Sequence, residues 1–285
     1  MIIVWMSCVL LGLGPQDVGQ AANEVFGGLV GPGLRLSEQE IRFPEPSIRD
    51  GQADSQQRTA LEEVCGSSAR ADDLLRDSVY APFVLKLEDR DGKNGDVVRV
   101  AHLWFAIRAD FAKLDPEQFT PGEADPVEAA NMRFGGKVVD EKELKAQGIE
   151  LPKHETGQEQ VWYVHSTGDL LDRIHVEKTT KVEATRSDES LLVAAMPAKE
   201  FGIEGPAPSF WKNTKEGGSV QAYDGGGGYV KVTRYKPIPG VLIVEAHLAF
   251  LEPEGWFQGR PILRSKIGIV TQDQIRDLRR SLAKP

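Results

Sequence analysis

Residues 241–251 read VLIVEAHLAFL, and their alternation predicts one long β-strand. Side chains of a strand point to its two faces in turn. One face would carry Val241 and Ile243 together with Glu245 and His247, and the other only apolar residues: Leu242, Val244, Ala246, Leu248 and Phe250. One apolar face and one partly polar face are typical of an antiparallel sheet that covers a core on one side.

Residues 261–282 follow and read PILRSKIGIVTQDQIRDLRRSL. A helix that begins at Pro261, a favoured first helical position, would carry one apolar stripe: Leu263, Ile267, Val270 or Thr271, Ile275, Leu278 and Leu282. The alternative is a strand over 262–270, because Gly268 disfavours a helix and β-branched residues surround it, with a shorter helix from Thr271. We favour the single helix because its stripe is unbroken.

The composition is that of an ordinary globular chain, with 40% hydrophobic and 27% charged residues. The net charge of −9 argues against binding to nucleic acid or to anionic membrane surfaces, since both are polyanions. We expect a monomer that binds no nucleic acid.

The first residues, Met1–Ala22, resemble a secretory signal peptide. An apolar run over 2–13 is too short to span a bilayer, and small residues at 19–22 offer a cleavage site. We therefore expect an exported protein, periplasmic or extracellular, whose mature chain has no transmembrane segment. After cleavage Cys65 would be the only cysteine, so no internal disulfide is possible. Its helical setting predicts a buried structural thiol.

The mature chain divides into an N-terminal arm and one domain. Residues 23–55 lack a sustained period and are rich in glycine and proline, which predicts an extended arm or linker. Residues 56–285 form the domain, with a polar insertion near 115–158 that contains a helix over 140–148.

The glycine run 225–228 lacks the Lys-Ser/Thr of a phosphate loop and predicts a flexible hairpin loop. Short helices are expected at 56–65 and 71–77, a hairpin at 81–87 and 97–108, and further strands at 161–165, 171–185, 191–196, 220–223 and 229–235.

The order of elements over 160–282 resembles the end of START-like proteins of the helix-grip fold. The resemblance is carried by several antiparallel strands, then Gly255-Trp256-Phe257, Gly259-Arg260-Pro261 and the amphipathic C-terminal helix. It implies a curved antiparallel sheet that wraps the helix, with a lipid or another apolar ligand held between them. The family places two helices between its first two strands, whereas here the helices precede residue 81.

The candidate ligand-binding residues are Trp256, Phe257, Leu263 and Ile267. The two aromatic residues lie between glycines, where they would form either a lid over a cavity or a plug that seals the end of the sheet. Leu263 and Ile267 belong to the apolar stripe of the helix.

Two His and carboxylate pairs support a different hypothesis. His175 with Glu177, and Glu245 with His247, are each two residues apart and share a strand face. If their strands were neighbours, the four side chains would converge on a divalent metal or form an acid/base site.

These observations predict an α+β fold with a large curved antiparallel sheet, a C-terminal helix packed along it and short N-terminal helices. The favoured function is a non-catalytic binder of a lipid-like or apolar small molecule, with no cofactor. A metal-dependent or acid/base enzyme and a structural or partner-binding protein of the cell envelope remain alternatives.

Overall fold

The computed structural model describes residues 23–78, 82–114, 127–129, 132–151, 159–215, 217–257 and 262–282. The expected signal peptide at 1–22 lies outside them, as does part of the polar insertion. No described helix is both long and apolar enough to cross a membrane.

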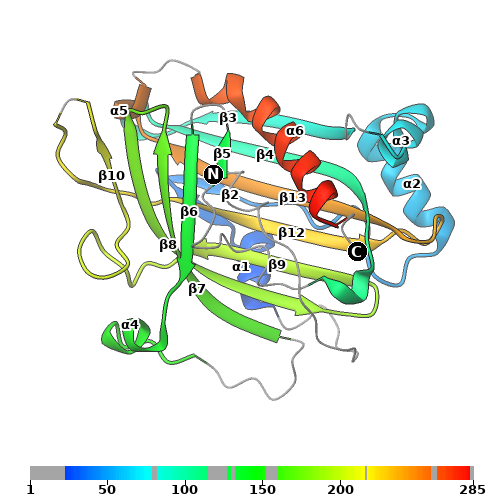
Figure 1. Cartoon of the computed structure of the whole chain (residues 1–285), viewed down its shortest axis with the longest axis horizontal. Helices are drawn as coiled ribbons and strands as arrows, with labels where there is room; N and C mark the ends of the chain where they lie inside the picture. Colours follow the sequence, from blue (N-terminus) through cyan, green and yellow to red (C-terminus); the bar gives the residue numbers. More distant parts are fainter. Residues whose placement is uncertain are drawn as a thin grey trace.

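One antiparallel sheet organises the molecule (Figure 1). Its C-terminal hairpin is inserted between β4 and β9, so the last strand of the chain pairs with the second strand of the sheet. In Figure 1 strands β6 to β8 run closer to vertical than β4, β12 and β13. This change of strand direction shows that the sheet is twisted and curved. In spatial order its strands are β3 (Phe83–Asp91), β4 (Val97–Arg108), β13 (Val241–Glu252), β12 (Gly226–Arg234), β9 (Ser190–Pro197), β8 (Ile174–Arg186), β7 (Glu159–Leu170), β6 (Met132–Val138) and β5 (Val127–Ala129), with β10 (Phe210–Asn213) beside the start of β8 and β11 (Gln221–Ala222) beside β10.

Helix α6 (Ile262–Leu282) packs along one face of this sheet, against β4. The single-helix prediction is confirmed, since the stripe from Leu263 to Leu278 is buried while Ile269 is exposed. At its C-terminal end the Arg279 guanidinium donates to the carbonyl oxygen of Ala106, 2.6 Å away. The α+β fold expected from the sequence is therefore present, with its C-terminal helix on a curved antiparallel sheet.

The opposite face is covered by the N-terminal residues. They form α1 (Glu24–Val30) and a small hairpin of β1 (Leu34–Leu36) and β2 (Gln39–Ile41), followed by α2 (Asp54–Cys65) and α3 (Ser68–Leu75). We call residues 23–52 the arm. The sequence predicted α2 and α3 but neither α1 nor the β1–β2 hairpin.

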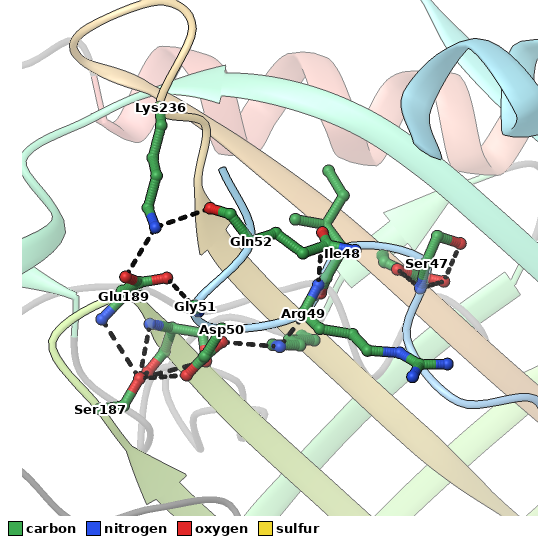
Figure 2. Close-up of polar contacts among 12 residues, drawn as sticks. Ser47, Ile48, Arg49, Asp50, Gly51, Gln52, Ser187, Glu189 and Lys236 are labelled. Atoms are coloured by element: carbon green, nitrogen blue, oxygen red, sulfur yellow. Dashed lines mark hydrogen bonds and ion pairs between the residues drawn. The ribbon is translucent and has the colours of Figure 1, made fainter. Parts of the chain in front are cut away.

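Buried polar contacts attach the arm to the sheet. The Glu183 carboxylate accepts hydrogen bonds from the backbone N–H groups of Glu24 and Val25, at the start of α1. The Lys231 ammonium forms an ion pair with Asp50 at 2.8 Å, and Ser187 and Ser190 donate to the same carboxylate (Figure 2). Burial alone would raise the pKa of Asp50, but these partners lower it.

The face of β13 that carries Glu245 and His247 is partly polar, as expected, but the arm covers it, which the sequence did not indicate. All 12 residues of β13 are buried, Glu245 and His247 included. The glycine run also differs from its prediction, because Gly226–Gly228 lie inside β12 rather than in a loop. A Cβ at Gly228 would lie 2.0 Å from the carbonyl oxygen of His247, so only glycine allows this close approach of the strands.

Two smaller predictions are confirmed. Residues 141–146 form α4 (Glu141–Ala146), with Asp140 and Glu143 in a reciprocal capping box. Cys65 is free and buried in the cluster that joins α2 and α3 to the sheet. Burial raises the pKa of its thiol, which fits a structural role.

Candidate functional site

The side of the sheet that carries α6 is called the inner face here. Cross-strand pairing places Ala184, Val193, Val230, Ala246 and Leu103 in one row across it, from β8 to β4. All five are buried in the same apolar core as the stripe of α6. The inner face therefore offers an apolar lining over most of the sheet, as ligand pockets do.

The four candidate ligand-binding residues lie in this core. Trp256 and Phe257, in α5 (Glu254–Phe257), expose 1% and 2% of their surface, and Leu263 and Ile267 are buried on α6. Trp256 packs against Tyr223 and Trp211, with ring centroids 5.4 and 6.3 Å apart. This burial favours the plug over the exposed lid.

Ion pairs tie the start of α6 to the sheet. The Arg99 guanidinium, almost fully buried on β4, pairs with Glu252 and, at 3.0 Å, with Asp89. Asp89 also accepts a hydrogen bond from Arg264 in the first turns of α6. Both carboxylates pair with arginine, so this end of the inner face is electrostatically satisfied.

One lysine on the inner face differs from these paired groups. Lys178 lies on β8 between Val176 and Thr180 and exposes 7% of its surface. No ion pair or hydrogen bond joins its ammonium to any described residue. Burial lowers the pKa of Lys178 to about 8, and no neighbouring charge contributes to that shift.

Other buried polar atoms on the same side also have no hydrogen-bond partner among the described residues. They are the hydroxyl of Thr180 on β8, the hydroxyl of Thr271 on α6 and the indole N–H of Trp256. Buried polar atoms of folded proteins nearly always have partners. A molecule bound between the sheet and α6 would supply hydrogen-bond partners for these atoms.

The metal hypothesis fails because the two His and carboxylate pairs do not meet. β8 carries His175 and Glu177, β13 carries Glu245 and His247, and β9 and β12 lie between them. Spacing along a strand determines which face a side chain occupies, but it carries no information on which strands become neighbours. Among the described residues, no group of three or more His, Cys, Asp or Glu side chains is arranged to hold a metal ion.

Each pair instead belongs to a separate network on the outer face. His247 Nε2 lies 2.8 Å from Glu245, which accepts hydrogen bonds from Ser47 of the arm. His247 Nδ1 also lies 2.6 Å from Nδ1 of His102 on β4. Burial first, and then His247, lower the pKa of His102 to about 4. This network attaches the arm to β13, and Glu245 and His247 are buried within it.

The second network borders an open groove. Glu177 bridges His165 and His175, both at 3.0 Å, and His175 also contacts Asp169 at 2.8 Å. The adjoining groove has a volume of about 380 Å³ and is lined by residues of β6 and β7, among them Lys137 and Thr167. Each ring nitrogen of His165 and His175 has a carboxylate or hydroxyl partner within the protein, so these contacts need no ligand.

Sequence reasoning missed Lys178. A signal was present, because residues 174, 176, 182 and 184 on the same strand face are Ile, Val, Val and Ala. A lysine in the apolar register of a strand is a candidate buried cation.

Comparison with known proteins adds little to this description. No family model matches the chain, and no curated protein matches its sequence. A similar solved structure is the lipid transfer and protein localization domain of human StarD13 (DLC2), at 10% identity and a TM-score of 0.31. The match covers 70% of this chain and 90% of that chain. A likeness this distant carries no argument about function, which rests on the inner face itself.

Proposed function

We propose that this protein is a non-catalytic binder of a lipid-like or otherwise apolar small molecule, held between the inner face of the sheet and α6. The observation that carries the proposal is the set of buried polar atoms without partners in an apolar lining. Small-molecule sites combine a mainly apolar wall with a few polar groups that orient the ligand. The four residues Trp256, Phe257, Leu263 and Ile267 would supply part of the wall.

We also propose that the chain is exported and acts as a monomer. The support is the composition of residues 1–22 and the acidic charge. An exported binder of this kind would carry an apolar molecule through water, shielded by the sheet and α6.

Native mass spectrometry tests the binding function. The protein, purified without detergent, is expected to carry a bound apolar molecule that is released on denaturation and identified by lipid mass spectrometry. The variant Ile267→Phe adds volume on the buried stripe and is expected to lose the adduct, whereas Ile269→Phe, on the exposed side of the same helix, keeps it. Circular dichroism confirms that both variants fold.

Two outcomes would contradict the proposal. One is a wild-type protein without any adduct that also fails to take up ten-carbon amphiphiles. The other is an adduct retained equally by both variants.

A further inference from the structure

The ammonium of Lys178 has no counter-charge among the described residues. Its stem runs beside the turn before β12, since a Cβ at Gly225 would lie 3.5 Å from its Cδ atom. The side chain exposes only 7% of its surface, and its ammonium contacts no described carboxylate or carbonyl oxygen closely enough for a hydrogen bond. An isolated ammonium in an apolar environment is costly unless a partner compensates it.

A second donor lies at the same end of the inner face. The indole N–H of Trp256 is buried without a partner among the described residues. Trp256 packs on Trp211, and Trp211 pairs with Val176, two residues before Lys178 on the same strand face. The hydroxyl of Thr180, two residues after Lys178, is also unpartnered within the described chain.

The chemistry of these groups selects one class of ligand group. An ammonium and an indole N–H can only donate, and a hydroxyl can donate as well. A carboxylate or phosphate offers several acceptor oxygens and a negative charge, whereas an alcohol or ester supplies no charge. Because the pKa of Lys178 is about 8, its ammonium is mainly charged at neutral pH.

Extending the proposed function, on which this step rests, we propose that the ligand is an anionic amphiphile whose carboxylate or phosphate headgroup pairs with Lys178. Its apolar chain then lies along the inner face toward α6, and its headgroup accepts hydrogen bonds from Lys178 and its neighbours. The plug formed by Trp256 and Phe257 closes the same end of the site.

Isothermal titration calorimetry with decanoate, decyl phosphate and decanol tests this assignment. These probes share one apolar chain, so they separate a carboxylate, a phosphate and an uncharged headgroup. Lys178→Met is expected to weaken binding of its preferred anion about 10- to 100-fold, the range for a hydrogen bond to a charged group, and to leave decanol within about threefold. Lys181→Met, three positions along β8 and on the other face, is the matched control and should bind as wild type does.

Lys178→Arg keeps the positive charge and is expected to retain most of the preference for the anion. This variant therefore shows whether weaker binding by Lys178→Met comes from the lost charge or from a disturbed fold. The headgroup assignment is overturned if wild type binds decanol as tightly as both anions, or if Lys178→Met weakens all three probes equally. Either result leaves apolar binding intact. Failure of wild type to bind any of the three probes would instead contradict the proposed function.

Discussion

Lys178 and Lys181 show how one residue type takes two roles three positions apart. Both lie on β8, but strand alternation turns Lys181 to the outer face and Lys178 to the inner face. Burial is the sole cause of the lowered pKa of Lys178. The difference comes from the surroundings that each face provides.

Replacing Lys178 should stabilise the ligand-free protein. Its pKa is about 8 in the folded state against 10.5 as the ordinary value, so between these values the unfolded chain binds more protons and wild-type stability rises with pH. We expect Lys178→Met to raise the free energy of unfolding by up to roughly 3 kcal/mol at pH 7, with the gain shrinking from about pH 8 to about pH 10.5. Urea denaturation across this range measures it. A variant less stable than wild type at pH 7 would show that the ammonium has a stabilising partner.

At the residue scale, the sequence predicts which face of a helix or strand is buried better than it predicts which distant residues contact each other. Cys65 and the apolar stripe of α6 were predicted correctly because local periodicity alone determines which side is buried. His175 and His247 were paired wrongly because their meeting depends on strand order, which no local pattern encodes.

At the level of elements, α6 illustrates how packing decides between two local preferences. Gly268 and the neighbouring β-branched residues favour a strand, yet the stripe continues for the whole helix. Burying that stripe against the sheet outweighs the modest cost of glycine inside a helix, about 1 kcal/mol. Most helical stability in proteins comes from such packing.

Two isoleucines on α6 test the contribution of the stripe. Ile275 is 0% exposed and Ile269 is 57% exposed. We expect Ile275→Ala to lower the free energy of unfolding by about 2 to 5 kcal/mol, and Ile269→Ala to change it by less than about 0.5 kcal/mol. Chemical denaturation of both variants measures the difference. Equal effects would mean that α6 does not depend on the sheet for its stability.

The elements of the arm could not be predicted from the sequence. α1 and the β1–β2 hairpin are short and have little periodicity, so no sequence window indicates them. They form because distant residues complete them, as Glu183 does at the start of α1. The burial of Glu245 and His247 under the arm was not predicted for the same reason.

For the whole molecule, the arm and the sheet depend on each other through buried charge. The Lys231 side chain is 1% exposed, and Asp50 of the arm is its ion-pair partner. Burial lowers the pKa of Lys231, and Asp50 opposes that shift. Removing the carboxylate would leave a second buried cation without its counter-charge.

Asp50→Asn is therefore expected to lower the free energy of unfolding by roughly 3 kcal/mol, the low end of the range for breaking a buried pair, since Asp50 itself is partly exposed. Glu45→Gln breaks the exposed pair with Arg49 in the same arm and should cost less than about 1 kcal/mol. Thermal unfolding of the two variants compares them. Similar losses would contradict a special role for the buried pair.

The attachment of the arm also dictates when folding can finish. Ser47 bonds to Glu245, 198 positions further along the chain, and Val25 bonds to Glu183. During synthesis the apolar side chains of the arm therefore leave the ribosome long before β13 exists to cover them. Closing such distant contacts is slow. The arm cannot dock until β13 has emerged, and over that interval its exposed apolar side chains are prone to aggregation.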